Sequence, residues 1–280
     1  MVWTQNKKRH RRLEKMAFEN ANRHGESFFM RILPYLSLAV FFLFWQLLVD
    51  FDVIPRQLLA TPTDVIKLFI KKLSDESPDG ALLLTHTWIS VQEAFLGYIL
   101  ALVIGVPFGL MIGWFRIFRG LTQPIFEMVR PIPPVALIPL AIFWFGIGLS
   151  SKVFIIWISG VIPCVINSYV GVRMTNPTLI NMAKTYGATS WGIFFKICIP
   201  SALPMVFGAL QIALAYSWIS LVAAELVAAN AGLGFLITMG RRLIMPDMVL
   251  LGMAMVALTG AILGIVISKV EKRLLAGIRR

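Results

Sequence analysis

Residues 87–113 read TWISVQEAFLGYILALVIGVPFGLMIG, and this stretch decides the fold class of the chain. Its only charged residue is Glu93, and the remainder is almost continuously apolar. A helix that crosses the hydrocarbon core of a membrane needs about 20 such residues in succession. We therefore expect residues 87–113 to form a transmembrane helix.

The rest of the chain repeats this pattern. The 280 residues are 58% hydrophobic and 14% charged, whereas soluble domains contain about a quarter charged residues. Five further apolar segments occupy residues 32–49, 124–145, 153–172, 202–228 and 248–268. The sequence predicts an all-α, polytopic membrane protein with about six transmembrane helices in one transmembrane domain, 32–275, behind a basic tail, 1–31. This length leaves no room for a separate soluble domain.

The distribution of basic residues predicts the orientation. If the tail is cytoplasmic, the segments on the cytoplasmic side contain 18 Lys and Arg residues, against 7 on the outer side, with Arg130 unassigned. Cytoplasmic loops carry such an excess, so we expect both termini in the cytoplasm of a multi-pass inner-membrane protein. The net charge of +12 is then explained by topology and by attraction to anionic lipid, and no nucleic acid is expected as a partner.

A short helix is expected in the first outer connection, beginning at Thr61-Pro62-Thr63-Asp64. This stretch offers an N-cap, a proline at the first helical position and an acid in the first turn. Within span 87–113, small residues recur every four positions on one ridge, which favours close approach of another helix. They are Gly97, Ala101, Gly105, Gly109 and Gly113.

Prolines interrupt the third span. Arg130-Pro131-Ile132-Pro133-Pro134 and Pro139 cannot lie in one continuous helix, because each proline removes a donor and clashes with the preceding turn. Irregular backbone at membrane depth is tolerated where it lines a watery cavity, so Arg130, Pro133 and Pro134 are candidates for a translocation pathway. Trp144 follows closely enough to line the same cavity. The alternative is a proline-rich turn at the membrane interface.

Three ionisable residues fall in or beside apolar spans, where an unpaired charge costs at least about 2.5–3.5 kcal/mol. Glu93 and Glu225 should therefore be paired or hydrated. Glu225 is either a pathway residue or a structural carboxylate, and Arg130 either binds planar oxyanions or extends to the interface. His86 is expected at the interface.

The connection 174–200 contains Asn181-Met182-Ala183-Lys184-Thr185-Tyr186-Gly187-Ala188 and ends in Ile197-Cys198-Ile199-Pro200. A short helix up to Tyr186, a glycine turn and a second helix from near Ser190 would form a compact helix-turn-helix. The segment resembles the EAA loop of ABC importer permeases, with Ala183, Gly187, Ile197 and Pro200 at the family spacing. It departs from that pattern at Asn181 and Met182, where Glu and Ala are usual, and at Ile199, which stands for Leu.

The resemblance extends over about residues 55–275 and is strongest to the permeases that serve nitrate, sulfonates, taurine and related small solutes. It is carried by Leu59-Ala60-Thr61-Pro62, Arg130-Pro131-Ile132-Pro133-Pro134, Phe145-Gly146-Ile147-Gly148, Ala224-Glu225 and Gly232-Leu233-Gly234-Phe235. In the Ser-x-x-Arg-x-x-x-Gly pattern of that subfamily, Ser90 and Gly97 match, but Glu93 replaces the Arg. The resemblance implies a small anionic cargo such as nitrate, a sulfonate, taurine or bicarbonate, and this reversal of charge counts against that inference.

The resemblance implies a type I importer permease fold and a transport subunit that is not an enzyme. Its implied partners are a second copy of the chain, two cytoplasmic ATPase subunits that bind ATP and Mg, and an extracytoplasmic solute-binding protein. The loop residues expected to contact the ATPase are Asn181, Ala183, Lys184, Thr185, Tyr186, Gly187, Ala188 and Pro200.

Two other classes of protein are weighed against this interpretation. A membrane-embedded enzyme would need a catalytic constellation, and neither HExxH nor Gly-x-Ser-x-Gly occurs in the sequence. An ion-gradient-driven carrier acting alone is typically built from internal repeats, and none is visible. No phosphate-binding loop or metal-ligand cluster occurs, so no cofactor is expected in this chain.

Overall fold

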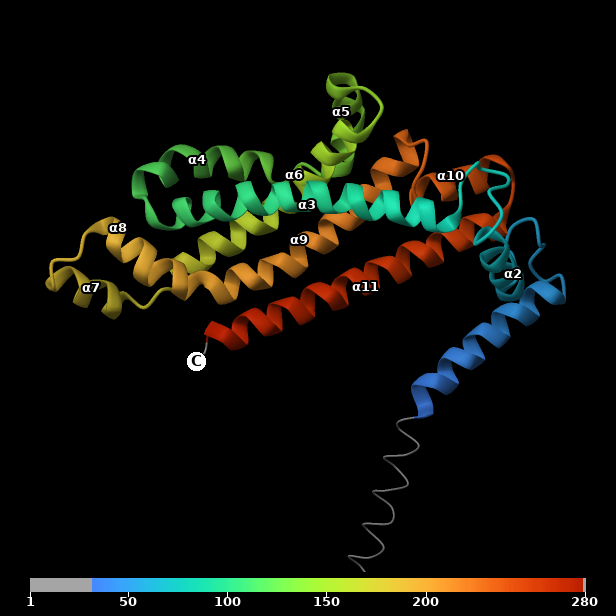
Figure 1. Cartoon of the computed structure of the whole chain (residues 1–280), viewed down its shortest axis with the longest axis horizontal. Helices are drawn as coiled ribbons and strands as arrows, with labels where there is room; N and C mark the ends of the chain where they lie inside the picture. The colour runs from blue at the N-terminus through green and yellow to red at the C-terminus, as the bar shows by residue number, and fades with distance from the viewer. Residues whose placement is uncertain (1–31, 279–280) are drawn as a thin grey trace, which may run out of the picture. The chain divides into compact units, whose positions relative to one another are not determined.

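The computed structural model describes residues 32–278, and every regular element within that range is helical (Figure 1). The all-α prediction is therefore confirmed. Five of these helices are long and apolar enough to cross a membrane, and a sixth span results if one bent helix pair counts as a crossing. The chain divides into two compact units, residues 1–64 and 65–280. The basic tail, 1–31, lies outside the described residues.

The first unit contains an apolar helix, Ile32–Asp50, whose side chains are mostly exposed. At its end, Asp50 accepts a hydrogen bond from Gln46 at 2.8 Å and pairs with Arg56 at 2.9 Å. Helix α2 (Pro62–Lys72) then begins at the predicted signal, because the Thr61 hydroxyl accepts a hydrogen bond from the Asp64 amide at 3.1 Å.

Three long helices form the centre of the second unit: α3 (Leu83–Trp114), α6 (Leu149–Arg173) and α9 (Ile199–Ala228). α6 packs along both α3 and α9 (Figure 1). The predicted glycine ridge of α3 faces α6, where a Cβ added at Gly97 would lie 2.5 Å from the Ile156 side chain. At Gly109 the same atom would lie 2.8 Å from Ser168 Cβ. Glycine is therefore required there by close helix packing.

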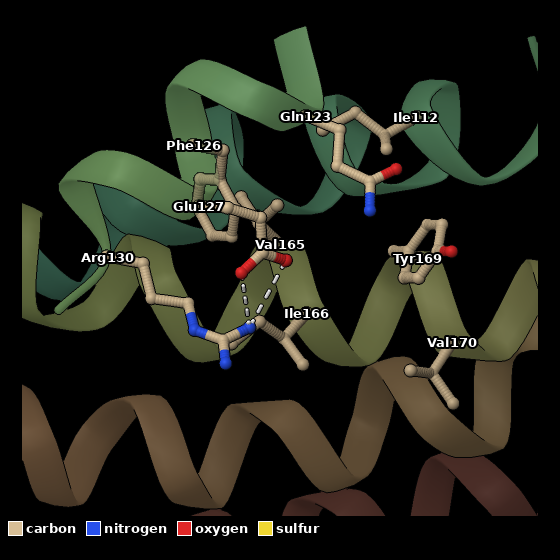
Figure 2. A pocket seen from close by; sticks show the side chains of 9 residues that line it. All are labelled: Ile112, Gln123, Phe126, Glu127, Arg130, Val165, Ile166, Tyr169 and Val170. Carbon is tan, nitrogen blue, oxygen red and sulfur yellow. Dashed lines mark hydrogen bonds and ion pairs between the residues drawn. The ribbon is translucent and has the colours of Figure 1, made fainter. Parts of the chain in front are cut away.

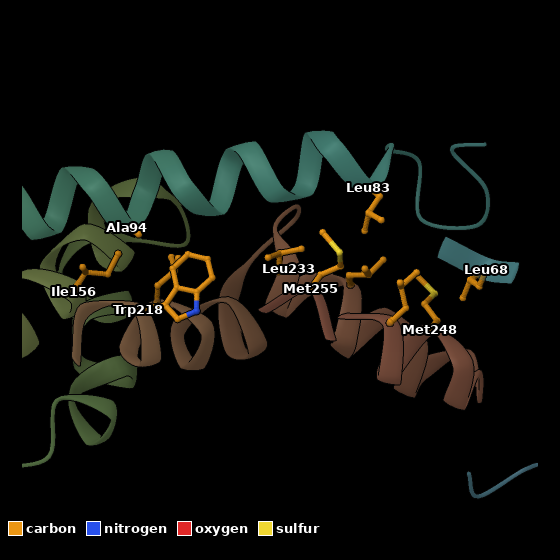
Figure 3. Packing of buried hydrophobic residues seen from close by; sticks show 11 residues of the cluster. Leu68, Leu83, Ala94, Ile156, Trp218, Leu233, Met248 and Met255 are labelled. Carbon is orange, nitrogen blue, oxygen red and sulfur yellow. The ribbon is translucent and has the colours of Figure 1, made fainter. Parts of the chain in front are cut away.

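Helices α10 (Leu233–Arg242) and α11 (Pro246–Ile278) pack on one another and on α9. Their shared core contains Leu83, Trp218, Leu233 and Met248 (Figure 3). The Trp218 indole donates a hydrogen bond to the Val256 carbonyl at 3.2 Å, which satisfies its polar group inside this apolar cluster.

The proline-rich segment breaks the chain as predicted. Helix α4 (Arg116–Val129) ends before the prolines, and a 3₁₀ turn η1 (Pro134–Leu137) leads into α5 (Ile138–Phe145). The two helical pieces meet at 83°, so residues 124–145 form no straight helix. Gly146 and Gly148, with φ of 74° and 155°, connect α5 to α6 in conformations that favour glycine.

The last connection is more helical than the sequence indicated. After α7 (Pro177–Thr185), helix α8 (Ser190–Ile193) continues through a π-helical turn, Phe194–Cys198, directly into α9. The resulting apolar helix runs from Ser190 to Ala228, whereas the sequence predicted a span from 202.

Candidate functional site

The turn between α7 and α8 is built around Gly187. Helix α7 ends at Thr185, and the chain reverses where Gly187 adopts φ of +77°. The Gly187 amide donates to the Lys184 carbonyl and the Ala188 amide to the Ala183 carbonyl, each at 3.0 Å. This pattern closes the carbonyl end of a helix and places its turn residue in the left-handed region, which glycine adopts without strain.

Side-chain caps define the starts of both helices in loop 174–200. The Asn176 side chain accepts from the Thr178 amide at 2.9 Å, and the Thr189 hydroxyl accepts from the Gly192 amide at 3.2 Å. The helix-turn-helix predicted from the sequence is therefore present, with its second helix beginning at Ser190.

Part of loop 174–200 packs on the ends of the long helices, and most of its other residues are exposed. Ile193, Phe194 and Cys198 are buried in a cluster to which Ala183 adds its methyl group. Tyr186 is 86% exposed. The other exposed candidates of this loop are Asn181, Lys184, Thr185, Gly187, Ala188 and Pro200. This exposed face is therefore available to a partner.

The broken segment lines a cavity of about 360 Å³ between η1, α6 and α9. Arg130, Pro133 and Pro134 all contribute to it, and Ser159 and Tyr216 lie across from them. The structure thus brings three of the six pathway candidates together. Arg130 also lines a neighbouring pocket of about 190 Å³, where it pairs with Glu127 at 3.1 Å (Figure 2).

The other three candidates lie apart from this cavity. Glu93 pairs with Lys152 at the start of α6, and both side chains are less than a tenth exposed. Trp144 is 56% exposed and packs edge-on against Phe154, with ring centroids 5.9 Å apart. Glu225, at 1% exposure, accepts hydrogen bonds from other parts of the second unit.

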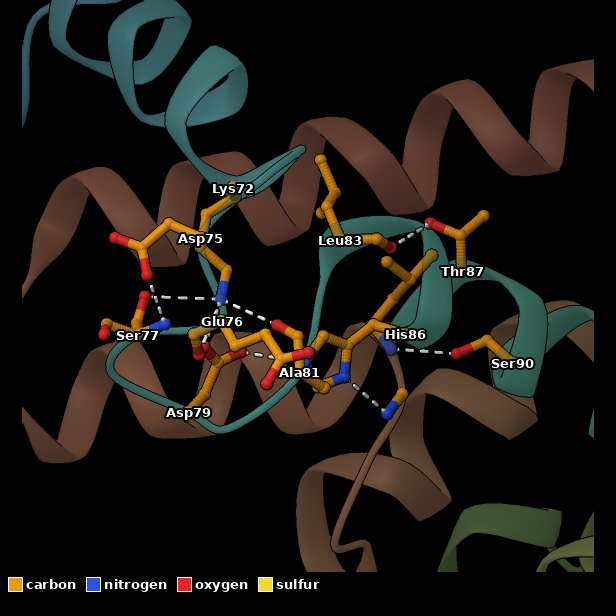
Figure 4. A network of polar contacts seen from close by, with 12 residues as sticks. Lys72, Asp75, Glu76, Ser77, Asp79, Ala81, Leu83, His86, Thr87 and Ser90 are labelled. Atoms are coloured by element: carbon orange, nitrogen blue, oxygen red, sulfur yellow. Dashed lines mark hydrogen bonds and ion pairs between the residues drawn. The ribbon is translucent and has the colours of Figure 1, made fainter.

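A buried polar network at the start of α3 was not anticipated. Lys72 is fully buried, pairs with Asp79 and donates to the Ala81 carbonyl at 2.8 Å (Figure 4). Asp79 also contacts His86 at 2.8 Å, and His86 is fully buried. The sequence did not indicate that His86, in the first turn of α3, is buried among protein side chains. Lys72 and Asp79 lie in a polar segment of the kind found at protein surfaces, so no local sequence pattern predicted that they are buried.

Comparison with known proteins places this geometry in context. Residues 105–280 match the family model described as "Binding-protein-dependent transport system inner membrane component". The taurine transport system permease protein of Escherichia coli (strain K12) is 32% identical over 241 residues, which cover 85% of this chain and 86% of that protein. The nitrate import permease protein of Synechocystis sp. (strain ATCC 27184 / PCC 6803 / Kazusa) is 29% identical over 210 residues, or 74% and 75% of the two chains.

A solved structure has the same fold. An inward-facing form of the MetNI methionine ABC transporter superposes with a TM-score of 0.58, covering 71% of this chain and 96% of the matched chain at 22% identity. At this identity the likeness concerns the fold alone, and it confirms the predicted importer-permease architecture. Among residues 32–278, no cluster of three or more His, Cys, Asp or Glu side chains is arranged to hold a metal ion.

Proposed function

We propose that this chain couples ATP hydrolysis in partner subunits to the import of a small solute. It belongs to the family of binding-protein-dependent transport system inner membrane components. The observation that carries this proposal is the exposed helix-turn-helix around Gly187, which leads without interruption into the long helix that borders the Arg130 cavity. The helix would transmit a movement of the turn directly to that cavity.

The assembly in this proposal contains two copies of the chain, two ATPase subunits and an extracytoplasmic solute-binding protein. The ATPase subunits bind ATP and Mg and contact the exposed face of loop 174–200. Both termini and this loop lie in the cytoplasm, and the transmembrane domain spans residues 32–275. This chain performs transport and carries no catalytic residues of its own.

The cargo in this proposal is a small solute of the kind named for the relatives, such as taurine or nitrate. Arg130 supports an anionic group on that cargo, because its guanidinium stays charged and offers a planar fork to an oxyanion. The negative charge of Glu93 does not argue against an anionic cargo. Glu93 is paired with Lys152, and neither residue lines the Arg130 cavity.

The coupling role is tested at Gly187. Gly187→Ala and Gly80→Ala are matched, because both glycines have φ near +80° and neither added Cβ would meet an atom within 4 Å. The backbone strain, about 1–2 kcal/mol, is therefore similar in the two variants. We expect only the change at Gly187 to reduce ATP hydrolysis stimulated by the loaded binding protein, and Gly187→Asp to abolish that stimulation. A Gly187→Asp complex that assembles and responds normally contradicts the proposal.

The pathway role is tested at Arg130 in proteoliposomes. We expect Arg130→Ala to abolish uptake while assembly with the ATPase is retained, and Arg130→Lys to restore uptake only in part because lysine lacks the planar fork. Arg116→Ala, at the other end of α4, is the control and should transport normally. Full uptake by Arg130→Ala excludes a contact with the cargo.

A further inference from the structure

The first turn of α10 is held by side chains of two other helices. The first N–H groups of a helix have no partner within the helix. Here three successive amides each donate to a buried side chain: Gly232 to His86 Nδ1 at 3.0 Å, Leu233 to Ser90 Oγ at 2.8 Å, and Gly234 to Glu225 Oε2 at 2.7 Å. The exposure of His86, Ser90 and Glu225 is at most 1%, so water does not compete for these amides.

The geometry at His86 assigns its tautomer. Because Nδ1 accepts from the Gly232 amide, the neutral ring must carry its proton on Nε2, which donates to Asp79 Oδ2 at 2.8 Å. The other oxygen of Asp79 is engaged by the Lys72 ammonium. A second proton on the ring would have to occupy Nδ1, where it would face the Gly232 N–H. Protonation therefore replaces an attractive contact with two opposed donors.

Glu225 completes the same arrangement from α9. Its carboxylate accepts from the Ser90 hydroxyl at 2.6 Å and from the Gly234 amide, so both oxygens are used. Two charged groups, Glu93 and Lys152, also interact with Glu225, and they are paired with one another. Gly234 fits because a Cβ there would lie 2.6 Å from Glu225 Cβ. The start of α10 is thus fixed by packing as well as by hydrogen bonds.

We propose that His86, Ser90 and Glu225 are positioning residues that form a clamp on the first turn of α10, and that His86 makes this clamp sensitive to acid. At neutral pH all three amides are bound. As the pH falls and Nδ1 takes up a proton, the bond to Gly232 is lost and the first turn of α10 keeps only the bonds to Ser90 and Glu225. The arrangement concerns folding within one chain and does not rest on the proposed transport function.

Hydrogen–deuterium exchange on the full chain, purified in lipid nanodiscs with its co-purifying subunits, tests the clamp. Protection of residues 229–236, corrected for intrinsic exchange rates, is compared at about pH 7.5 and about pH 4.5, an interval that extends below the pH at which an exposed histidine changes charge. Loss of one neutral hydrogen bond should lower protection about 5-fold. The first turn of α7, capped by the amide side chain of Asn176, is the internal control and should keep its protection.

Two substitutions separate the contacts of the imidazole. His86→Asn keeps an acceptor near the position of Nδ1 and cannot be protonated, so protection of the α10 turn should stay high at both pH values. His86→Gln reaches toward Asp79 and loses the acceptor for Gly232, so protection should be about 5-fold lower at both values. The proposal is overturned if the wild type shows no fall beyond that of α7, if the Asn variant falls as the wild type does, or if the Gln variant retains full protection at the higher pH.

Discussion

Replacement of Lys152 by methionine should destabilise the protein strongly, because it leaves the carboxylate of Glu93 buried without a counterion. The two side chains are 8% and 9% exposed, and Glu93 Oε2 has no hydrogen-bond partner among the described residues. Removal of one partner from a buried ion pair costs about 3–5 kcal/mol. We expect Lys152→Met to lower the free energy of unfolding by about this amount.

The double variant Glu93→Gln/Lys152→Met should recover most of the loss, since neutral replacement of a buried pair is often close to neutral in stability. Unfolding of the purified protein by a denaturing detergent, followed by circular dichroism, measures both effects. The exposed pair Lys71–Asp75, with nitrogen and oxygen 3.5 Å apart, supplies the control. Lys71→Met should cost at most about 1 kcal/mol.

The reasoning is refuted if Lys152→Met is no more costly than Lys71→Met, or if the double variant is as unstable as the single one. Uptake by the double variant then decides the role of Glu93. If the double variant transports normally, Glu93 has a structural role. If the double variant is stable but does not transport, Glu93 acts in the translocation pathway.

Two further outcomes follow from the packing and the charge distribution. Gly109→Ala should reduce the melting temperature, because the added methyl group lies 2.8 Å from Ser168 Cβ and overpacking costs about 1–3 kcal/mol; Gly264→Ala, where nothing lies within 4 Å, should not. A single cysteine at Asp75 should react with a membrane-impermeant reagent in intact cells, and one at Lys184 should react only after lysis. The reverse labelling pattern would show that the orientation is inverted.

Structural features that depend only on residues close together in the sequence were predictable. The start of α2, the four-residue glycine ridge of α3 and the turn at Gly187 each have a local signal, and each is confirmed. The prolines after Arg130 likewise predicted a break, because no helix accepts them in succession. They did not predict the 83° bend, which depends on how α5 packs against α6.

The partners of the ionisable residues were not predictable. Glu93 meets Lys152 across 59 positions, and His86 meets the amide of Gly232 across 146. Lys152 precedes the predicted span 153–172, yet its side chain is only 8% exposed. The continuity of the last connection with the fifth span was also missed, because the sequence predicted a short helix from near Ser190 and a separate span from 202, whereas Ser190–Ala228 form one helix.

The uninterrupted helix from Ser190 to Ala228 has a mechanical consequence. At about 1.5 Å per residue its 39 residues form a lever roughly 58 Å long. Beyond its midpoint the helix lies tightly on α6, where a Cβ at Gly160 would be 2.6 Å from Ser217 Oγ, and this contact can act as a pivot. Tilting about that point moves the Gly187 turn and the Glu225 carboxylate in opposite directions. A push at one end of the protein would therefore pull on the first turn of α10 at the other.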